Sequence, residues 1–119
     1  MKLLDSQQKF SLYVSGLIRY IYDCGYKCTL GDAYRSTEQA AIYANLSVGV
    51  KNSLHCKRLA IDINLFSKTG EYLNKTESYV RFGEYWESLD PNNRWGGHFK
   101  RPDGNHFETQ EEYEEQKKH

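Results

Sequence analysis

The sequence of 119 residues predicts one α+β domain, in which about three helices flank a small sheet. Three segments carry apolar side chains at the spacing of three and four residues that is typical of helices. The segment 59–65 instead alternates apolar and polar residues, as a strand with one buried face does. A chain of this length can bury a core without a disulfide framework or a structural metal.

The first helix is predicted over residues 6–23, which carry six apolar side chains at helical spacing: Phe10, Tyr13, Val14, Leu17, Ile18 and Ile21. Asp5 or Ser6 can cap its start, and Gly25 stands where a C-terminal cap belongs. Residues 26–30 then predict a strand, which the turn at Gly31 and Asp32 ends.

The second and third helices are predicted from their caps and stops. Ser36 and Gln39 form the pattern of a capping box, and alanines continue that helix to about Asn45. The third helix is marked by apolar residues from Tyr79 to Leu89 and must end before Pro91. The tail after about residue 109 runs from acidic to basic, which suits a short, solvated helix.

The composition excludes several classes of protein. The formal net charge is zero, so the chain lacks the electrostatic footprint of a nucleic-acid-binding protein. The three cysteines, Cys24, Cys28 and Cys56, are an odd number, which favours a reduced compartment over a disulfide scaffold. Cys24 and Cys28 could be half of a structural zinc site, but the sequence has no second pair, so we expect free thiols.

The strongest functional signal is a set of metal-binding side chains in two short motifs. Asp62 lies on the polar face of the predicted strand together with Ala60, seven residues after His55. His106 comes from a second short strand. Two histidines and one carboxylate suit a catalytic zinc ion, which typically takes three protein ligands and leaves a fourth position for water.

Two further acids flank the second histidine. Glu108 shares a strand face with His106 and is placed to orient a ligand. Asp103 lies in a turn three residues before His106, within reach of a water molecule at the metal. Taken alone, Asp103 is most simply a turn former and Glu108 a surface charge. The spacing of the whole set favours the functional interpretation.

These motifs resemble a known family. The matching residues are Ser53, His55, Ala60 and Asp62, then Trp95-Gly96-Gly97, then Asp103, His106, Phe107 and Glu108, with a Tyr-Arg-Ser segment upstream at residues 34–36. The pattern resembles the zinc D-alanyl-D-alanine carboxypeptidases and dipeptidases, and looks most like their phage relatives, the L-alanyl-D-glutamate endopeptidases of endolysins. The resemblance implies a small antiparallel sheet that bears the zinc site, in a fold shared with the hedgehog signalling domain.

The resemblance also implies a catalytic role for each residue of the motifs. His55, Asp62 and His106 would hold one zinc ion. Asp103 would be the general base that takes a proton from the attacking water and passes it to the leaving amine. Arg35 would bind a substrate carboxylate or steady the oxyanion.

Several neighbouring residues are candidates for substrate contacts. Ser53 and Gln39 match the family and could contact the substrate or orient a ligand. Trp95 could line the cleft or pack in the core, and the sequence leaves both open. His98 is a fourth possible ligand, which we expect to be exposed or in contact with substrate because three ligands are already found.

One residue departs from the family pattern. Many carboxypeptidase and dipeptidase members have Gly three residues after the first ligand histidine, where this chain has Arg58. A larger side chain there could narrow or recharge one end of the site. Together with Asp rather than Glu at position 103, it favours the phage endopeptidase branch.

The resemblance therefore predicts a monomeric peptidase that cuts the stem peptide of bacterial peptidoglycan, at the L-alanyl-D-glutamate bond, as a phage or prophage endolysin. The first residues carry neither a long apolar segment nor a small-residue cleavage site, so we expect no signal peptide, and no apolar run is long enough to span a membrane. Synthesis in the host cytoplasm and release through a holin-type pore are expected. Two alternatives stay open: a D,D-carboxypeptidase or dipeptidase acting on D-alanyl-D-alanine ends, and a zinc-stabilised binding module without turnover.

Overall fold

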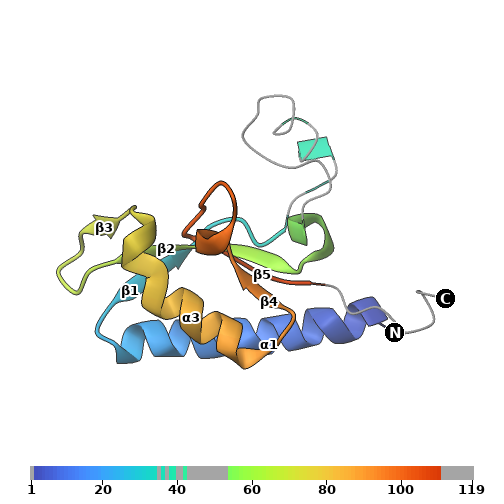
Figure 1. Cartoon of the computed structure of the whole chain (residues 1–119), viewed down its shortest axis with the longest axis horizontal. Coiled ribbons are helices and arrows are strands. Elements are labelled where there is room, and N and C mark those ends of the chain that lie inside the picture. The colour runs from blue at the N-terminus through green and yellow to red at the C-terminus, as the bar shows by residue number, and fades with distance from the viewer. Residues whose placement is uncertain (1, 35, 37, 40–41, 43–53, 111–119) are drawn as a thin grey trace.

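Two helices pack on one face of a small antiparallel sheet (Figure 1). The computed structural model describes residues 2–34, 36, 38–39, 42 and 54–110. Helix α1, Lys2–Asp23, runs along the length of the molecule, and α3, Val80–Leu89, lies against it. None of the described helices is long and apolar enough to cross a membrane.

The sheet has the strand order β1-β2-β5-β4, and β3 pairs with β2 outside this path. All of these pairings are antiparallel, so the predicted α+β class and sheet type are confirmed. The strands are β1 (Lys27–Leu30), β2 (Ala60–Phe66), β3 (Tyr72–Leu73), β4 (Asn93–Trp95) and β5 (His106–Thr109).

Strand β2 divides the molecule into a packed side and an open side. Its residues Ile61, Ile63 and Leu65 are buried in the core, as the alternation predicts. The helices contribute Phe10, Leu17, Ile21, Phe82 and Trp86 to the same core. Asp62 and Asn64, which alternate with these residues, therefore lie on the face of the sheet away from the helices.

Helix α1 begins earlier than its cap residues predict. Neither Asp5 nor Ser6 caps it, because the helix already begins at Lys2 and Ser6 is buried at 1% exposure within it. The packing of Leu3 against the core extends the helix toward the N-terminus. Its C-terminal end is as predicted, because Gly25 adopts φ 88° and the N–H of Tyr26 bonds to the carbonyl of Ile21.

The other predicted elements have different outcomes. Only residues 38, 39 and 42 of the second predicted helix are described, and all are helical. The N–H of Gln39 donates to Ser36 Oγ at 3.0 Å, as a capping box requires. The third helix follows a short 3₁₀ turn, Thr76–Tyr79, and ends at Leu89 before Pro91. The tail predicted as a helix lies outside the described residues.

A 3₁₀ turn, η1 (Leu54–Lys57), leads into β2 and ends in an unusual way. The N–H of Arg58 bonds to the carbonyl of His55 at 3.2 Å, and that of Leu59 to Leu54 at 3.0 Å. This is the hydrogen-bond pattern of a Schellman motif, whose left-handed residue is usually glycine. Arg58 adopts φ 58° there, which costs a residue with a Cβ atom roughly 1–2 kcal/mol.

Candidate metal centre

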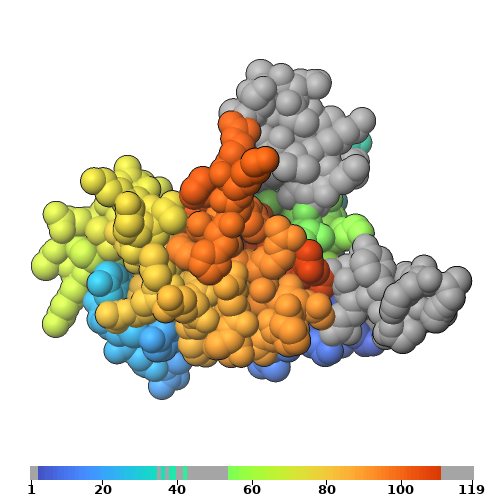
Figure 2. Space-filling model, viewed as in Figure 1, coloured from blue at the N-terminus to red at the C-terminus, as the bar shows by residue number. Residues whose placement is uncertain are grey.

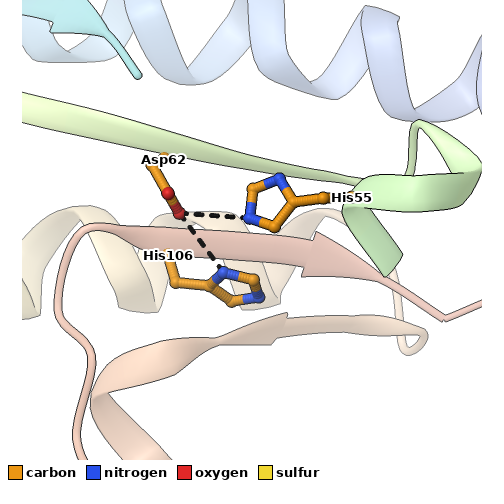
Figure 3. Close-up of side chains that lie close together, drawn as sticks. All are labelled: His55, Asp62 and His106. Carbon is orange, nitrogen blue, oxygen red and sulfur yellow. Dashed lines mark ion pairs between the residues drawn. The ribbon is translucent and has the colours of Figure 1, made fainter. Parts of the chain in front are cut away.

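Three side chains from separate elements converge on the open side of the sheet (Figure 3). His55 comes from η1, Asp62 from β2 and His106 from β5. Asp62 Oδ1 lies 3.3 Å from His55 Nε2 and 3.3 Å from His106 Nδ1. The three possible ligand atoms all lie within 4.8 Å of one another, so the residues predicted as ligands form one group that could hold a metal ion.

The sheet register places two of these residues opposite each other. Asp62 and His106 are direct partners in the antiparallel pairing of β2 with β5. The backbone of Asp62 is held on its other edge, where its N–H bonds to the carbonyl of Asp32 at 3.0 Å. His55 is buried at 2% exposure by the turn before β2. The ligand group is thus fixed by backbone pairing and burial.

Two of the three separations between these atoms are close to those around a tetrahedral zinc ion. Two ligand atoms at about 2.1 Å from zinc in tetrahedral geometry lie about 3.4 Å apart, and Asp62 Oδ1 lies 3.3 Å from a nitrogen of each histidine. Asp62 Oδ1 is buried, and the described residues give it no well-aligned hydrogen bond. A buried carboxylate needs a charged partner, which here is either a protonated histidine of the group or a bound metal ion.

Glu108 fixes the orientation of the second histidine. Its Oε1 lies 2.7 Å from His106 Nε2, which places the Nε2 proton in that hydrogen bond and leaves Nδ1 facing Asp62. Glu108 is buried at 8% exposure, and Arg94 Nε lies 3.5 Å from its Oε2. The arrangement is what we expect of an acid that orients a ligand.

The site strongly favours positive charge. Burial raises the pKa of Asp62, but the adjacent His106 and His55 outweigh it and lower that pKa to about 2. Burial lowers the pKa of His106, but Asp62 and Glu108 outweigh it and raise that pKa to about 9. Asp62 and Glu108 thus favour a positive charge at His106, which is either a proton on the ring or a metal ion bound to it.

The segment between β4 and β5 projects from the body of the molecule and carries Asp103 (Figure 2). Asp103 is exposed, and its carbonyl accepts the N–H of His106 at 3.1 Å. Its own N–H bonds to the carbonyl of Gly96 at 2.9 Å. A Cβ atom on Gly96 would collide with the Asp103 carbonyl and the His106 Cβ atom. Gly96 therefore allows the turn that joins the predicted base to the second histidine.

Trp95 belongs to the core and does not line a cleft, which corrects its prediction as a substrate contact. It is buried at 2% exposure, and its Nε1 donates to the carbonyl of Gly104 at 2.7 Å. The ring packs so close to Gly83 and Gly97 that neither position has room for a Cβ atom. Trp95 supports the projecting segment from beneath.

His98 is not part of the ligand group. His98 is exposed, as expected, and its Nδ1 lies 3.2 Å from Glu87 on α3. Gln39 is half-buried, and its described contact is the backbone bond of the capping box. Arg35 and Ser53 lie outside the described residues, so their roles stay predictions.

The structure adds neighbours of the site that the sequence motifs missed. Phe99 packs against the His106 ring, with 5.6 Å between ring centres, and Arg94 covers Phe99 at 4.8 Å. Asn64 accepts a hydrogen bond from Asn105 at 3.2 Å, just before β5. Asn64 shares the polar face of Asp62, so the alternation of β2 could have indicated it.

Comparison with known proteins identifies the family. The family model described as D-alanyl-D-alanine carboxypeptidase matches residues 48–109, which are just over half of the chain and include all three ligand candidates. The chain belongs to this peptidase family. Among curated proteins no match is found.

The fold of this peptidase is also that of a solved relative. It matches the crystal structure of the L-Ala D-Glu endopeptidase ChiX of Serratia marcescens with a TM-score of 0.60 and 18% sequence identity. The match covers 71% of this chain and 67% of ChiX. At this identity the likeness establishes a shared fold.

Proposed function

We propose that this peptidase is zinc-dependent and hydrolyses the stem peptide of bacterial peptidoglycan. The observation that carries the proposal is the His55, Asp62 and His106 group, in which Asp62 Oδ1 lies 3.3 Å from a nitrogen of each histidine, close to the separation of ligands around a tetrahedral ion. The family match supports peptide hydrolysis. When bound, zinc would polarise the scissile carbonyl and lower the pKa of a water molecule to about 7.

The remaining steps belong to the side chains of the chain itself. Asp103 is proposed as the general base, because its turn leads directly into His106. Its carboxylate takes the proton of the attacking water and then protonates the leaving amine. Glu108 keeps His106 oriented through the bond to Nε2. Arg35 is proposed to bind a substrate carboxylate or the developing oxyanion.

The proposed scissile bond is L-alanyl-D-glutamate. The shared fold with an enzyme described as an L-Ala D-Glu endopeptidase supports this choice. A role as a phage or prophage endolysin, released through a holin-type pore, rests on the resemblance of the motifs to the phage enzymes. The second candidate is a D,D-carboxypeptidase, which the description of the matching family favours.

Digestion of purified peptidoglycan sacculi tests the proposal. The zinc-loaded protein should release peptides that begin with D-glutamate and leave sugar strands that end in lactyl-L-alanine. His106→Ala should lose zinc and activity together, whereas Arg19→Ala, on an exposed helix face, should retain both. Free D-alanine as the sole product would establish the carboxypeptidase instead. Full zinc occupancy in His106→Ala would contradict the ligand assignment.

A further inference from the structure

Arg94 lies on the same face of the sheet as the candidate metal ligands. It is the middle residue of β4 and is exposed, whereas its neighbours Asn93 and Trp95 are both buried. Side chains of a strand alternate between its two faces, so Arg94 points away from the core. The register of β4 with β5 places it directly opposite Glu108. Arg94 therefore shares the open side of the sheet with the ligand group.

Two contacts hold the Arg94 side chain in place. Its Nε lies 3.5 Å from Glu108 Oε2, and its guanidinium carbon lies 4.8 Å from the centre of the Phe99 ring. Phe99 belongs to the projecting segment, where its N–H bonds to the carbonyl of Gly96 at 3.1 Å. Stacking on a ring uses the face of the guanidinium and leaves its edge available to a carboxylate. One arginine can therefore make both contacts at the same time.

Both contacts of Arg94 lead to the second candidate ligand, His106. Glu108 Oε1 lies 2.7 Å from His106 Nε2, the ring nitrogen that points away from Asp62 (Figure 3). Phe99 packs against the same imidazole, with 5.6 Å between the ring centres. The contacts thus close into a ring of four side chains: Arg94, Glu108, His106 and Phe99.

Glu108 needs a partner for each of its carboxylate oxygens, because it is buried at 8% exposure. Its Oε1 is paired with His106. In the part of the chain that the structure describes, Arg94 is the one arginine or lysine that forms an ion pair with Glu108. Without this partner at Oε2, the carboxylate could turn and lose the bond that fixes the imidazole. Arg94 therefore restricts Glu108 to the orientation in which it holds His106.

We propose that Arg94 is a positioning residue of the metal centre, which holds Glu108, and through it His106, in the orientation that binds the metal ion. The inference rests on the proposed function in that it takes His106 as a zinc ligand. The sign of its effect is opposite to that of its charge. Removal of a cation near a metal site would by itself strengthen zinc binding. Loss of a contact that orients a ligand would weaken it.

The zinc affinity of Arg94→Gln, measured by competition with a calibrated chelator, tests the proposal. We expect binding roughly 10-fold weaker than that of the wild type, at the lower end of the range for groups around a ligand, since Arg94 acts through Glu108. Arg94→Lys should bind zinc with intermediate affinity, because it keeps the charge but loses the planar group that pairs and stacks at once. Arg101→Gln is the matched control: it removes an exposed cation of the projecting segment and should not weaken binding.

A double-mutant cycle identifies the route of the effect. In a Glu108→Gln background, Arg94→Gln should change the zinc affinity by no more than about twofold, because the carboxylate that Arg94 positions is already gone. The melting temperature of metal-free Arg94→Gln should stay close to that of the wild type, because an ion pair with a half-exposed arginine contributes little to folding. Weaker zinc binding is then separated from a general loss of stability.

NMR of the zinc-loaded protein reports the orientation of the ligand directly. The Nε2 proton of His106 should exchange slowly with water in the wild type and faster in Arg94→Gln, because the bond to Glu108 opens more often. Zinc binding by Arg94→Gln as tight as that of the wild type, or tighter, would overturn the positioning role. The same 10-fold loss in the Glu108→Gln background would also overturn it. A zinc-loaded wild type that cleaves no peptidoglycan would overturn the proposed function alone.

Discussion

His106 is held between two carboxylates, and this arrangement decides how the site binds cations. Asp62 lies 3.3 Å from Nδ1, and Glu108 lies 2.7 Å from Nε2. The hydrogen bond to Glu108 fixes the ring, so that Nδ1 faces the other two candidate ligands. The contribution of Glu108 should therefore appear in metal affinity.

Glu108→Gln should weaken zinc binding by roughly 10–100-fold, the usual effect of losing an acid that orients a ligand. The amide preserves shape and burial but removes the negative charge beside His106 Nε2. Competition with a calibrated chelator would measure the affinity. Glu84→Gln, on an exposed position of α3, is the matched control and should bind zinc as the wild type does. Equal affinities in both variants would show that Glu108 has no such role.

Asp103→Asn should separate zinc binding from turnover. Asp103 is exposed and joined to His106 through the backbone, so the amide should leave the fold and metal content intact. The rate of peptide hydrolysis should fall by about 10²–10⁴-fold, because positioned acid–base catalysis contributes that much. Paired measurements of zinc content and kcat check this expectation. Near-normal kcat in a fully zinc-loaded variant would exclude Asp103 as the base.

At the scale of elements, the link from β4 to β5 connects the core to the site. Trp95 is buried beneath it, and the glycines that follow let the chain fold back closely on itself. Gly96 approaches both the Asp103 carbonyl and the His106 Cβ atom. The Trp-Gly-Gly motif thus positions the turn from Asp103 to His106.

Gly96→Ala should lower both the melting temperature and the specific activity of the folded protein, because the added methyl group displaces the Asp103–His106 turn. Gly25→Ala is the control: it places a side chain at φ 88° far along the chain, where a Cβ atom meets no neighbour within 4 Å. The control should lose stability but keep its specific activity. Thermal melts and activity assays of both variants measure these two effects. If Gly96→Ala kept the specific activity that Gly25→Ala keeps, the expectation would be wrong.

The elements show why some features were predictable from the sequence. The alternation of β2 was visible because seven residues carry a clear period, and it placed Asp62 correctly opposite the core. Strands β3 and β4 have two and three residues, too few to show any period, and were missed. Trp95 was ambiguous because a tryptophan before two glycines suits a cleft or a core equally, and only the packing around it decides.

The left-handed backbone at Arg58 was missed for a different reason. A sequence signal for that conformation depends on glycine or asparagine, and here the residue is arginine. The early start of α1 was also missed. Cap residues indicate where a helix could begin, whereas the packing of Leu3 against the core determines where this one does begin.

At the scale of the whole molecule, the metal-free protein should become less stable between pH 6.5 and pH 9. The pKa of His106 is raised from 6.5 to about 9, so its contribution is complete below pH 6.5 and is lost as pH rises through 9. The pKa of Asp62 is lowered from 3.8 to about 2, so its contribution is present above pH 3.8 and is lost as pH falls toward 2.

Bound zinc should reverse this loss of stability between pH 6.5 and pH 9. The metal replaces the proton on His106, so zinc binds more tightly as that proton leaves. Urea unfolding at a series of pH values, with zinc and with a chelator, would measure both curves. His106→Asn should flatten the alkaline decline of the chelated protein. A metal-free wild type with constant stability from pH 6.5 to pH 9 would contradict the raised pKa.

Strand β2 carries core residues on one face and Asp62 on the other, so an error in its pairing would disturb the core and the metal site together. A slip of one residue in its pairing with β5 would turn Ile61 and Ile63 toward water and Asp62 into the apolar interior. Such a chain would lose its packing and its metal ligand in a single step. Misregistered molecules would therefore be unstable and open to proteolysis, so few inactive copies would persist as folded protein.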